Sequence, residues 1–187
     1  MKKVVVKAKL HGRSKFVSMF ENIDLKFSEP YWQHDRIFVT KNYHYDSDEP
    51  RVYFRTIVKD PKKPATYEII LHRQLVDQDY DLFFTTGIKD YSEAVMIMYQ
   101  LGFDLKSEFT RRRQELLLTK NIHLYIDKFD NVPNYYVRAE MLLDDEDDAT
   151  IAKEDLKQTL IAFEINKKDF TDETYDEILD IEKAVNP

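Results

Sequence analysis

Charged side chains recur at every second position in the middle of this sequence, along residues 104–128. The region is predicted to form two strands joined by a polar turn near Lys120 and Asn121. In the second strand, apolar residues alternate with polar ones, the period of two expected of a strand with two different faces. The charged sides of the two strands carry Phe109, Arg111, Arg113, Glu115, His123, Tyr125 and Asp127. Two adjacent strands of this kind indicate a sheet with one polar-lined surface.

The same one-sided charge marks other predicted strands. These elements cover 2–10, 32–43, 51–59, 67–74, 81–88 and 135–143, and their charged faces carry Lys3, Lys7, Lys9, Arg51, Arg55, Glu68, His72, Arg138 and Glu140. Short turns between them imply antiparallel connections and an α+β fold. Eight such strands can close into a β-barrel wide enough for one small ligand, provided that helices cover the outside. The other interpretation is an ordinary sheet whose charges face solvent, and the pattern alone does not decide between them.

Three or four helices are predicted beside the strands, over 14–23, 90–101, 150–163 and a last segment after Thr171. The second is the best defined, because Asp90 can cap it and Glu93 stands where a capping box needs it. Its apolar stripe is predicted to contain Ala94, Ile97, Met98 and Leu101. The last helix is expected to use Tyr175, Ile178, Leu179 and Glu182.

Composition narrows the class of protein. The 187 residues, 43% of them hydrophobic, predict one domain over 1–187. No run reaches the roughly 18 apolar residues of a membrane span, no signal peptide follows Met1, and there is no cysteine, so we expect a cytoplasmic protein without disulfides. Three glycines exclude the common glycine-rich phosphate loops.

The net charge of −7 is unevenly distributed. The part from residue 142 onward carries a balance of −10, whereas residues 1–141 carry +3. The run DDEDD at 144–148 is expected to be a solvated loop leading into an acidic, helical C-terminal part. An acidic chain without an aromatic and basic platform is not expected to bind nucleic acid.

Several segments, taken in order, resemble a known family. Residues 33–38 resemble its Q-x-D-x-[YF]-F segment, 53–55 its L-R-x-R strand, 69–72 its L-T-x-K strand, 94–103 its helix ending in L-G-F, 111–113 its K-x-R, 126–127 its L-D, 131–140 its G-L-G-x-F-x-E-I-E and 174–179 its S-Y-x-x-L. The family is the CYTH superfamily, also called triphosphate tunnel proteins, which contains class IV adenylate cyclases, thiamine triphosphatases and inorganic triphosphatases. Order and spacing carry this resemblance, rather than any single motif.

The resemblance implies a closed tunnel of eight antiparallel strands that grips a triphosphate with basic side chains. Arginine forks can contact phosphate in a bidentate way, and carboxylates can hold Mg²⁺ or Mn²⁺ against phosphate oxygens. The expected substrate-binding residues are Lys7, Arg55, His72, Arg111, Arg113 and Arg138. The expected metal ligands are Glu68, Glu115, Asp127 and Glu140.

The sequence also departs from the family pattern. At the positions of E-x-E-x-K it has Lys3, Val5 and Lys7, so the lysine remains and both glutamates are absent. His72 replaces the strand lysine, and Arg138 stands at the first glutamate of F-x-E-I-E, although an extra residue nearby leaves its alignment open to a shift of one. Phe83 and Thr85 occupy positions where many members have a glutamate pair. The basic half of the site is thus better preserved than the metal half, and metal affinity is expected to be weakened.

Three functions follow as hypotheses. The chain is a CYTH-like binder of a nucleotide or other triphosphate or polyphosphate, which it hydrolyses or cyclises if a divalent metal binds. Alternatively it is a non-catalytic binder of a phosphorylated metabolite, or an interaction protein whose acidic tail contacts a basic partner. The individual residues have structural alternatives as well, since Asp127 could cap the turn after it and the glutamates could pair with the arginines. A monomer or a homodimer is expected.

Overall fold

A computed structural model describes residues 1–44, 49–75, 78–130 and 132–185, so Asn131 of the 131–140 motif segment lies outside the described residues. Most of the described chain is antiparallel sheet. The strands are β1 (Lys2–Leu10), β2 (Tyr31–Thr40), β3 (Arg51–Val58), β4 (Thr66–Gln74), β5 (Asp81–Ile88), β6 (Phe103–Thr119), β7 (Ile122–Phe129), β8 (Tyr135–Leu143) and the short β9 (Phe170–Thr171). Each expected strand is present, and the central pair is the hairpin β6–β7, whose turn lies at Lys120 and Asn121.

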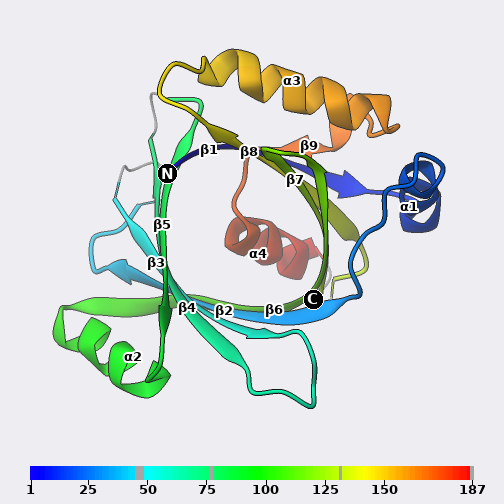
Figure 1. Cartoon of the computed structure of the whole chain (residues 1–187). Helices are drawn as coiled ribbons and strands as arrows, with labels where there is room; N and C mark the ends of the chain where they lie inside the picture. The colour runs from blue at the N-terminus through cyan, green and yellow to red at the C-terminus, as the bar shows by residue number, and fades with distance from the viewer. Residues whose placement is uncertain (45–48, 76–77, 131, 186–187) are drawn as a thin grey trace.

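Eight of these strands close into a ring (Figure 1). The order β5-β4-β3-β2-β6-β7-β8-β1 returns to its start because Lys2 and Lys3 of β1 pair with Leu82 and Asp81 of β5. Beyond this short contact, β9 takes over the same edge of β1 by pairing with Lys7 and Ala8. The expected closed, antiparallel α+β fold is confirmed.

The described part of the chain has four helices; the first three lie outside the strand wall, whereas the last lies across one end of the ring (Figure 1). They are α1 (Arg13–Glu21), α2 (Tyr91–Gln100), α3 (Ala149–Ala162) and α4 (Tyr175–Val185). A 3₁₀ turn, η1 (Lys167–Asp169), precedes β9. None of the described helices has the length and apolar character that crossing a membrane would require.

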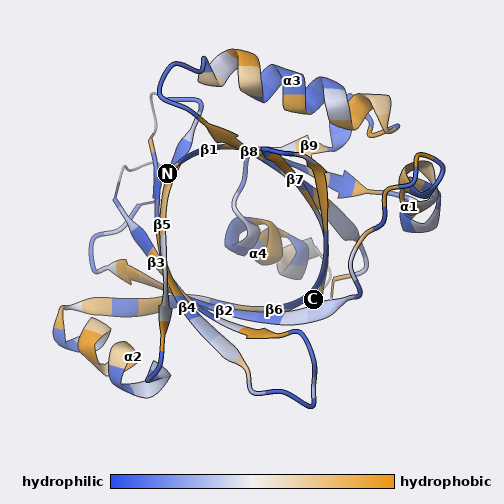
Figure 2. Ribbon diagram, in the orientation of Figure 1, coloured by the Kyte–Doolittle hydropathy of each residue, from blue (hydrophilic) through white to orange (hydrophobic). Residues whose placement is uncertain are grey.

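On β1, β2, β3, β7 and β8, buried apolar residues on the outer face pack against the helices. On β1, Val4, Val6 and Ala8 are buried and join a core formed with α1 and α3, to which Leu156 and Leu160 of α3 contribute. A second core lies between α2 and the outer faces of β2 and β3. Hydrophilic and hydrophobic residues therefore interleave along the strand ribbons (Figure 2). Because the helices cover the outer face, the charged residues of alternate positions are left facing inward.

Helix α4 closes one end of the ring. Its Tyr175, Ile178 and Leu179 are buried against inward-facing apolar residues at that end, namely Ile37, Val39, Phe109, Phe129 and Tyr136. In Figure 1 the helix is seen through the ring's opening. The enclosed space is therefore open at the end that faces the viewer in Figure 1, and α4 blocks the other end.

The predicted apolar stripe of α2 was wrong in part. Asp90 caps the helix by accepting a hydrogen bond from the backbone N–H of Glu93, as expected. However, Val95 and Met98 are the buried residues, whereas Ile97 and Leu101 are 52% and 67% exposed. Residues 94–99 are apolar on every side of the helix, so periodicity cannot select the face that meets the sheet.

Candidate functional site

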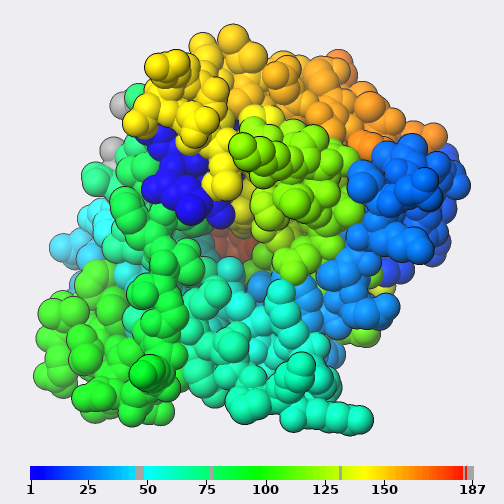
Figure 3. Space-filling model, in the orientation of Figure 1, coloured from blue at the N-terminus to red at the C-terminus, as the bar shows by residue number. Residues whose placement is uncertain are grey.

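The ring encloses one cavity of about 390 Å³. In the space-filling view the molecule is hollowed at its centre, and α4 is visible in dark red at the bottom (Figure 3). This volume lies within the range of small-molecule sites, roughly 300–1,000 Å³. Eight of the ten expected site residues line it: Lys7, Arg55, Glu68, His72, Arg111, Arg113, Arg138 and Glu140. The other two, Glu115 and Asp127, are not part of its lining.

Strand parity explains why these residues meet. They occupy alternate positions on β1, β3, β4, β6 and β8, and the register places Arg111 opposite Gln33, Arg55 opposite Asp35, and Lys7 opposite Arg138. Arg138 and Glu140 both face inward, so the open question of a one-residue shift at Arg138 is resolved in favour of an inward arginine.

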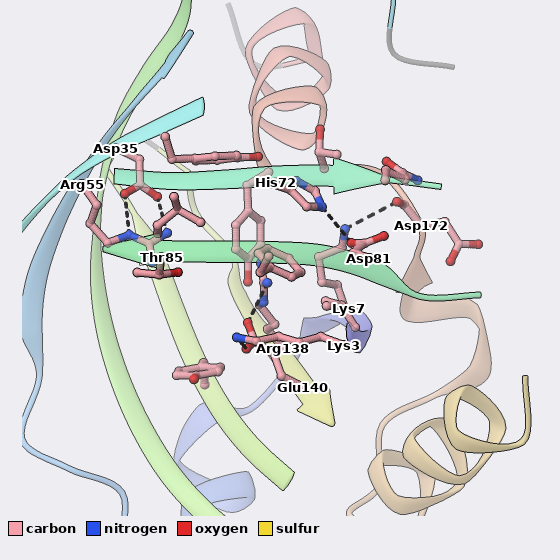
Figure 4. Close-up of a pocket in the computed structure, with 18 of the residues that line it drawn as sticks. Lys3, Lys7, Asp35, Arg55, His72, Asp81, Thr85, Arg138, Glu140 and Asp172 are labelled. Atoms are coloured by element: carbon pink, nitrogen blue, oxygen red, sulfur yellow. Dashed lines mark hydrogen bonds and ion pairs between the residues drawn. The ribbon is translucent and has the colours of Figure 1, made fainter. Parts of the chain in front are cut away.

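On one side of the cavity, arginines are held by buried carboxylates. Arg55 contacts Asp35 in a bidentate pair, Nε–Oδ1 at 2.7 Å and Nη2–Oδ2 at 3.0 Å (Figure 4), and Arg111 Nη2 lies 3.0 Å from the same Oδ2. Burial alone would raise the pKa of Asp35, but Arg55 and Arg111 lower it well below its usual range. Arg111 also donates hydrogen bonds from its Nε and Nη2 to Gln33 Oε1. Two guanidinium groups are therefore fixed in place before any ligand arrives.

A second pair lies deeper, next to α4. Arg113 donates from Nε and Nη2 to the two carboxylate oxygens of Asp127, at 2.7 and 2.6 Å. Tyr175 of α4 donates its hydroxyl to Asp127 Oδ2 at 2.6 Å. Burial acts to raise the pKa of Asp127, and Arg113 reverses this and lowers it. Asp127 thus positions an arginine and anchors the closing helix.

The opposite wall has fewer partners for its cations (Figure 4). Arg138 donates from Nη2 to Glu140 Oε1 at 2.6 Å, but its buried Nε has no hydrogen-bond partner within the part of the chain that the structure describes. Lys7 Nζ donates one long hydrogen bond, 3.4 Å, to the backbone oxygen of Asp172. Burial and the neighbouring Arg138 lower the pKa of Lys7 to about 8, although Asp81 opposes them. Positive charge is concentrated here without full compensation, as expected of an anion site before binding.

His72 lies on the same side but is already engaged. Its Nε2 is 2.9 Å from Asp81 Oδ2, and its ring stacks on Phe83 at a centroid distance of 4.5 Å. Burial lowers the pKa of His72 despite the hydrogen bond to Asp81. The imidazole is therefore neutral at pH 7 and contributes a hydrogen-bonding group rather than a charge.

The four expected metal ligands do not gather around one point. Glu115 is bound by Lys59 and Tyr31, each at 3.0 Å, near the far end of β6, and Asp127 is bound by Arg113. Both oxygens of Glu140 are occupied by cations, and only Glu68 lines the cavity without a side-chain partner among the described residues. Within those residues, nowhere do three or more His, Cys, Asp or Glu side chains converge as a metal site requires. This donor set does not fit the divalent cation that the resemblance implies.

Three site residues were not assigned a role from the sequence. Asp35 was part of a motif only, Tyr175 was expected as a residue of the last helix, and Lys3 was placed on a charged strand face and noted as a departure from the family pattern. Asp35 is two positions from Gln33 on β2, so the two side chains share one face of the strand. Its cross-strand neighbour is Arg55, and an ion pair between them could have been predicted from that. Tyr175 could not have been found from strand patterns, since α4 brings it to Asp127 from 48 residues further along the chain.

The architecture is a closed antiparallel ring around a cavity lined with arginine, lysine and carboxylate side chains. No protein-family model matches the sequence. No curated protein matches it either.

Solved structures match over nearly the whole chain. The PH1819 protein of Pyrococcus horikoshii has a TM-score of 0.80 at 14% identity, covering 95% of this chain and 97% of the other. A protein of Vibrio parahaemolyticus described as a putative adenylate cyclase has a TM-score of 0.78 at 18% identity, covering 95% and 97%. HpAC1 from Hippeastrum, described as a putative adenylyl cyclase with a dominant triphosphatase activity, has a TM-score of 0.60 at 11% identity, covering 95% and 94%. At such identities the likeness establishes the fold alone.

Proposed function

We propose that the cavity binds a small molecule carrying a triphosphate or a longer polyphosphate chain. The observation that carries the proposal is the convergence of Lys7, Arg55, Arg111, Arg113 and Arg138 on one enclosed space. Had the charged strand faces been solvated sheet surfaces, these groups would be spread over the outside. Guanidinium forks at fixed positions match phosphate oxygens, and the ligand would be held away from water, where charge-assisted hydrogen bonds are strongest.

Charge balance suggests where the phosphates lie. Seven Lys and Arg and six Asp and Glu side chains line the cavity, so the site as a whole is not strongly positive. Asp35 neutralises much of Arg55 and Arg111, and Asp127 does the same for Arg113. The end of the cavity at Lys7 and Arg138 keeps an unpartnered Nε and a weakly bonded ammonium group, and we assign the phosphates of highest charge density to that end.

Hydrolysis or cyclisation of the bound triphosphate is the second candidate, suggested by the activities named for the structural neighbours. Both reactions require neutralisation of charge that develops on the phosphates. The arrangement of carboxylates does not provide a metal site for this purpose, so binding without turnover is the function that the geometry supports best.

The test is a binding and turnover experiment on the same preparation. ATP, thiamine triphosphate and tripolyphosphate are each added once in EDTA and once with Mg²⁺ or Mn²⁺, and thermal unfolding, phosphate, pyrophosphate and cyclic nucleotide are all measured. We expect at least one of these ligands to raise the unfolding temperature without product. Arg138→Met should abolish most of the shift, because it removes the unpaired Nε and a guanidinium charge.

Arg112→Ala is the matched control. Arg112 lies on β6 between two cavity arginines but faces outward, where its guanidinium stacks over Trp32 at 5.4 Å. It should leave the ligand-dependent shift unchanged. Absence of any shift with all three ligands would contradict the binding function and leave the interaction role, and product formation would favour the enzyme.

A further inference from the structure

Lys3 places an ammonium group inside the cavity, at the wall formed by β1 and β8. Its Nζ lies 3.0 Å from Glu140 Oε2 and 5.0 Å from the centroid of the Phe83 ring. Figure 4 shows its side chain converging with those of Lys7 and Arg138 toward the same space. Lys3 and Lys7 are four positions apart on β1 and therefore lie on the same face of the strand, and Arg138 is the cross-strand neighbour of Lys7.

Two of these three cations, Lys3 and Arg138, share one carboxylate. Glu140 accepts from Lys3 at Oε2 and from Arg138 at Oε1, so each of its oxygens already contacts a cation of the chain. Burial acts to raise the pKa of Glu140, but Arg138 and Lys3 lower it well below its usual range, and the carboxylate stays ionised. With Asp81 also acting on Lys7, three positive charges stand against two negative ones, and the remaining excess is one that an anion can neutralise.

The remaining cavity carboxylates offer little to a divalent cation. Asp35 is occupied by Arg55 and Arg111, and Asp81 by His72. Asp79 and Asp172 lie next to Lys153. Glu68 is the cavity carboxylate without a side-chain partner among the described residues, so the protein offers the low end of the one or two carboxylates that hold Mg²⁺ beside phosphate oxygens and water. A cation entering this space would also be repelled by Lys3, Lys7 and Arg138. The chain's own ammonium and guanidinium groups can therefore neutralise phosphate charge that a metal ion would otherwise neutralise.

We infer that the cavity binds its polyphosphate ligand as the metal-free anion, with the Lys3 ammonium, held in place by Glu140, supplying positive charge in place of a divalent cation. This inference rests on the function proposed above. It extends that function by naming the ionic form of the ligand, because Mg²⁺ in solution chelates tripolyphosphate and withdraws the form that binds. Added Mg²⁺ should therefore weaken binding rather than support it.

Isothermal titration of the full-length protein with inorganic tripolyphosphate, once in EDTA and once in excess Mg²⁺, tests the inference. Binding in EDTA that becomes weaker in Mg²⁺ is the expected result. Binding that appears only with Mg²⁺ overturns the inference and leaves the proposed function intact. No heat of binding and no thermal stabilisation in either buffer overturns the proposed function itself.

Variants of Lys3 test its role separately. In EDTA, Lys3→Met should lower the affinity about tenfold to a hundredfold, the range for losing a charge-assisted hydrogen bond, and Lys3→Arg should retain most of it. Lys2→Met is the control, since Lys2 neighbours Lys3 but pairs with the exposed Asp145 and is not part of the cavity lining. Unchanged affinity in a folded Lys3→Met protein would contradict the assignment. If the Lys3→Met protein does not fold, Lys3→Arg and the native chain are compared in the two buffers. Lys3→Arg keeps the positive charge, so it should still bind tripolyphosphate in EDTA, and loss of that binding would contradict the assignment.

Lys3→Glu gives the converse result. It sets a second carboxylate beside Glu140 and removes one cation, so the affinity in EDTA should fall while added Mg²⁺ now raises it. A Lys3→Glu protein that binds tripolyphosphate in EDTA as tightly as the native chain would contradict the inference.

Discussion

At the scale of single residues, the interior of this ring is built from ion pairs rather than from apolar packing. Arg111, Asp35 and Asp127 are 2%, 1% and 0% exposed, yet all carry charge. Burying charges costs several kcal/mol per ion unless each is paired and hydrogen-bonded. The bidentate geometry of Arg55–Asp35 and Arg113–Asp127 meets that condition, and it orients the guanidinium groups of the cavity at the same time.

Breaking such a pair should be costly. Asp127→Asn leaves Arg113 without its counter-charge in a buried position, and we expect a loss of about 3–5 kcal/mol in the free energy of unfolding. Lys59→Met, which breaks the surface pair with Glu115, should cost no more than about 1 kcal/mol. Chemical denaturation of the two variants measures both values. Equal, small losses would mean that the buried pair contributes no more than the exposed one.

The ammonium group of Lys7 predicts a pH dependence of binding. Its pKa is lowered to about 8 in the free protein, by burial first and then by Arg138, and a bound anion favours the charged form. Affinity for tripolyphosphate should therefore be constant below about pH 8 and fall above it, by up to about tenfold per pH unit for a single proton. Titration calorimetry between pH 7 and 10 measures this. Lys7→Arg, whose guanidinium stays charged, should remove the decline, and a decline that persists would implicate another group.

At the scale of elements, each helix has its own relation to the ring. Helices α1 and α3 cover the outer face of β1, α2 covers β2 and β3, and α4 closes one end with Tyr175 bonded to Asp127. The acidic C-terminal part is thus joined to the cavity by a direct hydrogen bond. The DDEDD run between β8 and α3 is exposed, as expected, and Asp148 at its end caps α3 by accepting hydrogen bonds from the N–H groups of Thr150 and Ile151.

The orientation of α2 can be tested with a pair of substitutions. Met98→Ala removes a buried side chain and should cost about 2–5 kcal/mol in the free energy of unfolding. Ile97→Ala, one position earlier but half-exposed, should change it by no more than about 0.5 kcal/mol. Thermal or denaturant unfolding compares them directly. A larger loss at Ile97 would restore the stripe that the sequence pattern suggests.

At the scale of the whole molecule, a ring of strands around a charged cavity makes stability and ligand binding one equilibrium. A ligand that binds only the folded ring, present at 100 times its dissociation constant, should add about 2.7 kcal/mol to the free energy of unfolding. Because the contacts are ionic, this gain should shrink as the salt concentration rises, although less than for a surface site. Thermal unfolding with tripolyphosphate across a salt series measures it. Sulfate at equal ionic strength is the control for a non-specific anion effect.

Local sequence determined much of this architecture. Alternation of apolar and charged residues on β1, β6 and β7 is a property of single strands, so the strands, the hairpin turn and the placement of Arg111 and Arg113 on one shared face could be predicted from it. The cap of α2 at Asp90 could be predicted for the same reason, since it depends on residues three apart.

Only the tertiary structure decided which face of the ring was enclosed and which charges meet. A strand pattern states that two faces differ, but the side on which the helices pack is set by contacts between segments far apart in sequence. The same holds for the partners of each charge: Glu140 meets Lys3 across 137 residues, and Asp127 meets Tyr175 across 48. Whether a carboxylate faces a metal or an internal cation depends on such neighbours, because its own residue type allows both.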